Sequence, residues 1–166
     1  LVDITPSYTN KVVVTMHRRE NHRLIPEWFK QLDAAAKKHS DLEFILRIHP
    51  NPNVSKHRGL LKHVKVVEAL EYNEFIKLLA ECKFVITDSG GLQEESSFFR
   101  KKCIVCRETT ERIEGMGIFS FLSTSPDELV DLVGWVNGNH IPDSTEECPY
   151  GDGMAGVKIC EILKEQ

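Results

Sequence analysis

The segment FVITDSGGLQEE, which covers Phe84–Glu95, joins a short apolar run to a pair of glycines and then to a helix-forming stretch. Phe84–Thr87 has the length and the β-branched content of a buried strand in a parallel sheet. Gly90 and Gly91 follow at the point where a helix would begin, and we expect that helix to reach about Phe99. A strand that leads through glycines into a helix is the repeating unit of an α/β fold.

The same alternation continues on both sides of this segment. The other expected strands are Lys11–Met16, Leu42–Ile48, Val64–Val67, Cys103–Cys106 and Ile118–Leu122. The other expected helices begin near Ile25, Tyr72, Ser125 and Gly153, and they end near Ser40, Cys82, Val136 and Lys164. Helical spacing predicts that the last of them has one buried side, formed by Ala155, Ile159, Ile162 and Leu163. This alternation predicts a parallel sheet with helices on both faces, which binds ligands at the carboxyl ends of its strands.

Length and composition limit what kind of protein this is. A chain of 166 residues, of which 41% are apolar, suits one domain with its own hydrophobic core. No apolar run approaches the roughly 20 residues of a membrane-spanning helix, so we expect a cytoplasmic protein without membrane contact. The 21 basic and 25 acidic residues give a net charge of −4, which argues against nucleic acid as a partner. The chain starts at Leu1, and we expect the natural protein to be longer at this end.

The five cysteines are expected to be buried and reduced. Cys103 and Cys106 form a close pair, but their segment reads as a strand, in which residues three apart point to opposite faces. No second Cys or His pair follows at the spacing of a zinc site. The sequence therefore predicts neither a disulfide nor a bound metal ion.

The residues after the strand Phe84–Thr87 are the strongest candidates for ligand binding. Ser89 offers a hydroxyl donor, and two glycines at a helix start leave backbone N–H groups open to an anion, which the helix dipole also favours. Glu94 and Glu95 are about 100° apart on the helix, so only one can face the same ligand and accept hydrogen bonds from a ribose diol. The segment is a candidate diphosphate site. The alternative is a glycine-rich turn in which Ser89 caps the helix and acidic residues complement its dipole.

Polar segments also follow three other expected strands, at the same edge of the sheet. His17 and Arg18 follow the first strand, where they have no packing role, and arginine suits phosphate or carboxylate. The alternative for these two residues is a solvated charged turn. His49 follows the second strand in a loop stiffened by two prolines, and it either donates to a ligand or caps its own loop. The charges and hydroxyls of Arg107–Gly115, after the fifth strand, suit a polyhydroxylated ligand, whereas the alternative is a surface loop with internal ion pairs. Phe75, taken alone, is expected in the core.

Taken together and in order, these motifs resemble the C-terminal half of the non-hydrolysing UDP-N-acetylglucosamine 2-epimerase family. The matching segments are TMHRREN at 15–21, HPNPNV at 49–54, DSGGLQEE at 88–95, RETTERIE at 107–114 and PYGDGMA at 149–155. The resemblance runs from about Lys11 to the end of the chain. It implies a Rossmann-like sheet that forms one half of a GT-B-like two-domain enzyme, with a nucleotide sugar between the domains. Residues 1–166 are accordingly expected to form a single UDP-binding domain, without the N-terminal catalytic half.

The resemblance also implies roles for individual residues. Ser89, Gly90 and Gly91 match the diphosphate-binding segment of the family. Glu95 matches a glutamate that binds the ribose, and Phe75 matches a ring that lies beside the uracil. These five residues are therefore the expected substrate-binding residues.

A second group of residues is assigned by the same resemblance. His17 matches a histidine that faces the diphosphate and the sugar, and Arg112 matches a position near the ligand, so these two are the catalytic candidates on this half. Arg18 and His49 match residues that contact a second, regulatory UDP-N-acetylglucosamine in some bacterial members. Ile113 stands where the family usually has proline, so this loop is expected to be less stiff.

The activity implied is the interconversion of UDP-N-acetylglucosamine and UDP-N-acetylmannosamine for surface polysaccharides. The C2 proton is removed, UDP is eliminated to leave a glycal, and UDP is added back after reprotonation, without a metal or redox cofactor. The carboxylates that move the C2 proton lie in the family's N-terminal half, so this chain alone is expected to be inactive. Its expected partners are UDP, a UDP-N-acetylhexosamine and the missing N-terminal domain, and the full-length enzyme is expected to be a homodimer.

Two other functions fit part of the sequence. The chain could be the donor-binding domain of a GT-B glycosyltransferase, which shares the fold and the carboxylate on the ribose. It could also be a non-catalytic module that binds nucleotide sugars. The continuous DSGGLQEE and TTER segments favour the epimerase.

Overall fold

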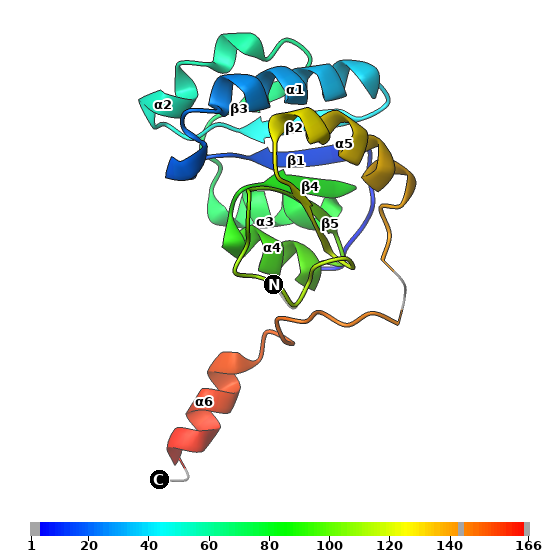
Figure 1. Ribbon diagram of the computed structural model, residues 1–166. Helices are drawn as coiled ribbons and strands as arrows, with labels where there is room; N and C mark the ends of the chain where they lie inside the picture. The colour runs from blue at the N-terminus through cyan, green and yellow to red at the C-terminus, as the bar shows by residue number, and fades with distance from the viewer. Residues whose placement is uncertain (1–3, 143–144, 165–166) are drawn as a thin grey trace.

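Six parallel strands form one sheet in the order β3-β2-β1-β4-β5-β6 (Figure 1). The computed structural model describes residues 4–142 and 145–164. The strands are β1 (Lys11–Thr15), β2 (Glu43–Arg47), β3 (Lys65–Val67), β4 (Phe84–Thr87), β5 (Lys102–Cys106) and β6 (Ser120–Ser123). The α-helices of this part are α1 (Ile25–Lys38), α2 (Pro52–Ser55), α3 (Tyr72–Glu81), α4 (Gly90–Phe98), α5 (Leu129–Gly138) and α6 (Ala155–Lys164). The predicted parallel sheet is confirmed, and its strand order is that of a Rossmann fold.

The two faces of the sheet bury different residues because side chains alternate along each strand. Val12 and Val14 of β1 point to one face and belong to the core that includes α1 and α5. Val13 points to the other face and belongs to the core that includes α3 and α4. Figure 1 shows α1 and α5 on one side of the sheet and α3 and α4 on the other. The expectation of helices on both faces is therefore confirmed.

The cysteines of β5 follow the same alternation. Cys103 and Cys106 lie in the cores of opposite faces, as their spacing predicts. Burial raises the pKa of the Cys103 thiol to about 12 and raises that of Cys106 as well. Cys82 is also buried, but Cys148 is half-buried and Cys160 on α6 is exposed, so the expectation of burial is wrong for these two.

The start of β6 differs from the sequence prediction. The strand begins at Ser120, whereas Ile118 is exposed and lies in the preceding turn. Gly117 in this turn has a φ of +82°, which glycine adopts without steric cost. The turn therefore delays the start of the strand by two residues relative to the apolar run.

Side chains cap the chain at two helix starts. The predicted capping box between Ser125 and Glu128 is confirmed, although the chain first forms a 3-10 turn over Pro126–Glu128 before α5 begins. The single turn α2 was not predicted from the sequence. The side chain of Asn51 caps it by accepting a hydrogen bond of 2.9 Å from the backbone N–H of Asn53.

The last helix does not pack as its sequence pattern predicts. No residue of α6 that the structure describes is buried, and Ile159, Ile162 and Leu163 are 56–64% exposed. The expectation that these residues and Ala155 form a buried side is therefore wrong for the described part of the chain. Helical spacing identifies an apolar stripe but not its partner, and Figure 1 shows α6 extending away from the sheet. Neither α6 nor any other described helix has the length and apolar character needed to cross a membrane.

The order of the strands determines where a ligand can bind. β1 lies between β2 and β4, and the chain builds the sheet outward from it in both directions. The connections after β1 and β4 therefore leave the sheet toward opposite faces, which opens a crevice at the carboxyl ends of these two strands. The loops that carry the predicted site residues all leave the sheet at this edge.

Candidate functional site

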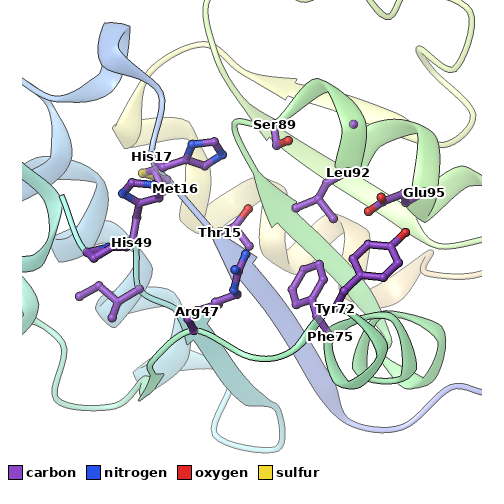
Figure 2. A pocket seen from close by; sticks show the side chains of 14 residues that line it. Thr15, Met16, His17, Arg47, His49, Tyr72, Phe75, Ser89, Leu92 and Glu95 are labelled. Atoms are coloured by element: carbon purple, nitrogen blue, oxygen red, sulfur yellow. The ribbon is translucent and has the colours of Figure 1, made fainter.

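A cavity of about 240 Å³ lies at this edge of the sheet, between α3, the first turns of α4 and the loops after β1 and β2 (Figure 2). The predicted site residues that line it are His17, His49, Phe75, Ser89, Gly91 and Glu95. The other lining residues are Thr15, Met16, Arg47, Ile48, Pro50, Ala69, Tyr72 and Leu92. Residues from four separate segments of the sequence therefore meet where the strand order places a binding crevice.

The buried carboxylate of Asp88 holds one wall of the crevice in place. It accepts hydrogen bonds from the backbone N–H groups of His17 (3.0 and 3.1 Å) and Arg18 (2.8 Å) and from the side-chain amide of Asn21 (3.1 Å). The amide of Asn21 also donates to the backbone carbonyl of Cys106 at 2.8 Å. A buried carboxylate is costly unless donors surround it, so these bonds fix the loop after β1 against the ends of β4 and β5.

Two threonines at the ends of neighbouring strands position the start of α4. The hydroxyls of Thr15 on β1 and Thr87 on β4 lie 2.6 Å apart. The hydroxyl of Thr87 also accepts a hydrogen bond of 3.0 Å from the backbone N–H of Ser89. These bonds turn the chain directly from β4 into the helix and leave Ser89 at the cavity wall.

The first turn of α4 is open toward the cavity. Ser89 precedes the helix, but its side chain makes no capping hydrogen bond and the first turn contains no acidic residue. The alternative of a serine-capped turn with acidic residues at the dipole therefore does not describe this helix start. A side chain at Gly91 would meet no atom within 4 Å. The unpaired N–H groups and the positive end of the helix dipole are thus accessible to an anion.

The two adjacent glutamates of α4 point in different directions, as their spacing predicts. Glu95 lines the cavity, and its carboxylate has no hydrogen-bond partner among the residues that the structure describes. Burial, with a contribution from the neighbouring charge of Glu94, raises the pKa of Glu95. Glu94 instead forms an ion pair with Arg112. Glu95 is therefore the carboxylate of this pair that is free to accept hydrogen bonds from a ligand.

Two histidines form the opposite wall. The rings of His17 and His49 stack with their centroids 5.3 Å apart and their planes at 14°. Nδ1 of His49 accepts a hydrogen bond of 3.1 Å from the N–H of Asn51, so His49 caps its own loop and lines the cavity at the same time. Burial lowers the pKa of His17, against the opposing effect of Asp88. The ring of His17 is therefore neutral at pH 7, with one nitrogen able to donate and the other to accept.

One end of the cavity is aromatic. Phe75 lines it but is only 6% exposed, since most of its ring packs in the core with α3. Tyr72, three residues earlier on α3, is 60% exposed. Figure 2 shows these two rings and Arg47 at one end of the cavity and Ser89 at the other. Both expectations for Phe75, core packing and a place at the site, agree with this position.

Three predicted residues, Gly90, Arg18 and Arg112, lie beside the cavity rather than in its wall. A Cβ atom at Gly90 would lie 3.7 Å from Nη2 of Arg18 and 3.8 Å from Cζ of Arg112, so both guanidinium groups lie close to the start of α4. The same atom would approach Oε1 of Glu111 to 2.9 Å, and the absence of a side chain makes room for this carboxylate. Arg18 also borders a separate hollow, with His17 and its neighbours.

Ion pairs hold the loop after β5, as expected from the alternative interpretation of this segment as a surface loop with internal ion pairs. Arg107 lies between Glu20 and Glu111, with N–O distances of 2.7 and 2.8 Å. Arg112 lies 3.6 Å from Glu111, in addition to its ion pair with Glu94. Because this network passes over the start of α4, it holds Arg112 near the candidate anion site while its charge is already partly neutralised.

Sequence reasoning overlooked four residues of the site: Thr15, Arg47, Tyr72 and Asp88. Asp88 lies inside the glycine motif, and its role as a clamp depends on donors about 70 positions earlier in the chain. Arg47 was read as part of a strand, although a cation that ends an apolar strand must point into the strand-end crevice or into solvent. Tyr72 and Thr15 carry no comparable signal.

The arrangement suits a phosphorylated organic ligand that also bears hydroxyl groups. It combines an open helix start, a serine hydroxyl, a neutral histidine and an unpaired carboxylate along one cavity. Within residues 4–142 and 145–164, no three His, Cys, Asp or Glu side chains are grouped closely enough to hold a metal ion.

The sequence model of the UDP-N-acetylglucosamine 2-epimerase family matches residues 4–164. The chain belongs to this family. It is 36% identical over 169 residues to a Ralstonia nicotianae protein named "Probable UDP-N-acetylglucosamine 2-epimerase", with 92% of this chain and 44% of the relative covered. It is 34% identical over 163 residues to the UDP-N-acetylglucosamine 2-epimerase of Escherichia coli K12, with 92% and 43% covered. The chain thus spans less than half the length of these family members, and the predicted match to the C-terminal half is confirmed.

Solved structures of family members have the same fold. The Neisseria meningitidis UDP-GlcNAc 2-epimerase bound to UDP-GlcNAc superimposes with a TM-score of 0.83 at 29% identity, covering 94% of this chain and 45% of that one. The Staphylococcus aureus MnaA–UDP structure gives a TM-score of 0.84 at 27% identity, covering 96% and 46%. An Escherichia coli heptosyltransferase, WaaC with ADP, gives a TM-score of 0.57 at 14% identity, covering 78% of this chain and 45% of that one. This likeness shows a shared fold alone.

Replacing Asp88 with asparagine tests whether its carboxylate holds the loop after β1. The new amide would place N–H groups opposite the N–H donors of His17, Arg18 and Asn21. We expect the free energy of unfolding to fall by about 2–3 kcal/mol. Urea denaturation measures the free energy of unfolding. The control is Asp131→Asn, which removes an exposed ion pair with Lys38 and is expected to change this free energy by less than about 0.5 kcal/mol. Equal stability of the two variants would contradict the role given to Asp88.

Proposed function

We propose that this chain is the UDP-binding half of a UDP-N-acetylglucosamine 2-epimerase, which interconverts UDP-N-acetylglucosamine and UDP-N-acetylmannosamine. The observation that carries the proposal is the cavity at the carboxyl ends of the strands, where an open helix start and a free carboxylate lie side by side on α4. Membership of the family supports it, as do the ligands of two related structures, UDP-GlcNAc and UDP.

The proposed placement of UDP follows the order of groups along the cavity. The diphosphate lies at Ser89, Gly90 and Gly91, where N–H groups and the helix dipole stabilise negative charge. The ribose hydroxyls donate to Glu95, one turn into the helix, and the uracil lies toward Phe75. The sugar extends toward His17 and the missing domain.

The proposed chemistry divides between the two halves of the enzyme. Removal of the C2 proton and elimination of UDP leave a glycal, and UDP is added back after a proton returns to the other face of C2. This half stabilises the negative charge that accumulates on the departing diphosphate, through the start of α4 and the neutral ring of His17. Arg18, which lies close to the same helix start, adds positive charge there, whereas the charge of Arg112 is already partly neutralised by Glu94 and Glu111. The groups that move the C2 proton are proposed to lie in the N-terminal half.

The partners of the chain follow from the same proposal. They are UDP, a UDP-N-acetylhexosamine and the N-terminal domain of the same enzyme, and the complete enzyme is proposed to be a cytoplasmic homodimer that serves polysaccharide synthesis. Arg18 and His49 are proposed to contact a second nucleotide sugar. The likeness to a heptosyltransferase concerns the fold alone, so it does not raise the glycosyltransferase alternative.

Titration of UDP into the purified chain tests the proposed binding residues. We expect weak binding to the wild type, because half of the cleft is missing. Ser89→Ala, which removes a donor, is expected to weaken binding by about threefold to tenfold, and Glu95→Gln by on the order of tenfold. Isothermal titration calorimetry measures both effects. Glu27→Gln, at an exposed position on α1, is the matched control and is expected to bind like the wild type.

The pH dependence of the same titration identifies the carboxylate involved. Because the pKa of Glu95 is raised, this group takes up a proton at a higher pH than an ordinary glutamate. Protonation removes an acceptor for the ribose, so the affinity for UDP should fall as the pH decreases through this raised pKa. In Glu95→Gln this part of the pH dependence should vanish. Unchanged affinity in both site variants would overturn the proposed site.

Measuring hydrogen exchange at C2 tests the division of labour between the halves. The chain alone is expected to produce no UDP-N-acetylmannosamine and no exchange of the C2 hydrogen with deuterated solvent, since the proton-transfer groups are absent. Proton NMR of UDP-N-acetylglucosamine incubated with the chain in D₂O detects either event. Exchange above the protein-free control would place a general base on this half and overturn the proposed division.

A further inference from the structure

Arg47 is a cation at the aromatic end of the cavity. It is the last residue of β2, and its side chain is exposed and lines the cavity. Its Cζ lies 5.4 Å from the centroid of the Phe75 ring. Since Phe75 is only 6% exposed, the guanidinium is the member of this pair that a ligand meets first. Figure 2 shows the two side chains next to each other, away from Ser89.

The guanidinium of Arg47 is free to bind a ligand. Among the residues that the structure describes, no carboxylate lies within 4 Å of it, whereas Arg107 and Arg112 on the other side of α4 are both held in ion pairs. The ring contact of Arg47 is with Phe75, and Figure 2 shows its guanidinium reaching past this ring toward Thr15 in the middle of the cavity. A guanidinium has only N–H donors, so it can recognise an acceptor on the ligand but not another donor.

The geometry of a pyrimidine nucleotide determines which acceptor reaches this position. If the diphosphate and ribose lie at Ser89 and Glu95, the ring extends from its N1 atom toward the aromatic end of the cavity. The C4 substituent is opposite N1 and therefore reaches farthest from the ribose. In uracil this substituent is a carbonyl oxygen, an acceptor, and in cytosine it is an amino group, a donor.

We propose that Arg47 is a specificity-determining residue that donates hydrogen bonds to the C4 carbonyl of the base and so selects uracil over cytosine nucleotides. The inference rests on the proposed function, because it requires UDP to lie in this cavity. A site that donates to an acceptor on the ligand discriminates strongly against an analogue with a donor at the same place. The guanidinium of the protein and the amino group of the analogue would then face each other without an acceptor.

Two other roles for Arg47 make different predictions. Stacking of the guanidinium on the base plane would stabilise uracil and cytosine nucleotides to similar extents, because both bases have a π face. Long-range attraction of the diphosphate would also act equally on both nucleotides. Only a hydrogen bond to the C4 substituent makes the ratio of the two affinities depend on Arg47.

Comparing UDP and CDP binding to three forms of the chain distinguishes these roles. For the wild type we expect UDP to bind on the order of tenfold more tightly than CDP. In Arg47→Ala this ratio should fall to near one, chiefly through weaker UDP binding. In Arg47→Glu the ratio should invert, because a carboxylate accepts from the cytosine amino group. Isothermal titration calorimetry gives both dissociation constants, and circular dichroism checks that each variant is folded.

Arg58→Ala is the matched control. Arg58 is an exposed arginine that pairs with Glu68 at 3.0 Å and does not line the cavity, so its removal changes the net charge equally and should leave the ratio as in the wild type. If UDP binds to the wild-type chain but the ratio of UDP to CDP affinity is the same in Arg47→Ala, the role of Arg47 is overturned while the proposed function stands. If neither nucleotide binds the wild type, both proposals fail.

Discussion

A single buried carboxylate connects the fold of this chain to its site. Asp88 follows directly after β4, and its oxygens accept from the backbone of the loop after β1 and from Asn21, which in turn donates to the end of β5. A charge in this position is tolerated because N–H groups surround it. The bonds bring together the ends of three adjacent strands and place His17 and Arg18 beside the start of α4. The wall of the cavity that His17 forms beside the start of α4 depends on this junction.

The cavity that results has a different chemistry at each end. At one end, the open first turn of α4 and Ser89 offer N–H and O–H donors, and Glu95 offers an acceptor one turn further along the helix. At the other end, Phe75 is covered by Arg47. A ligand that satisfies both ends carries an anionic group, hydroxyls and a planar ring, which is the composition of a nucleotide. The loop after β5 acts mainly through ion pairs that hold Arg112 near the helix start.

Much of this could be predicted from the sequence because the relevant signals are local. Continuous apolar runs such as Val12–Val14 indicate buried parallel strands, and the spacing of Glu94 and Glu95 predicts that only one faces the ligand. The clamp by Asp88 could not be predicted in the same way, since its donors lie about 70 positions earlier in the chain. The burial of α6 was predicted wrongly because an amphipathic pattern does not reveal whether the partner surface belongs to the same segment. Arg47 was missed because one charged residue at the end of an apolar strand resembles an ordinary strand boundary.

The proposed site requires that the diphosphate of the nucleotide binds at the start of α4, beside the loop that Asp88 holds in place. Amide chemical shifts in ¹H–¹⁵N NMR spectra, recorded while UDP is added to the labelled chain, show where the nucleotide binds. We expect the largest shifts at the amides of Ser89–Leu92 and of His17 and Arg18, and no change in α5 and α6. Shifts confined to the loop after β5 or to the region beyond β6, with residues 89–92 unaffected, would contradict the proposed site.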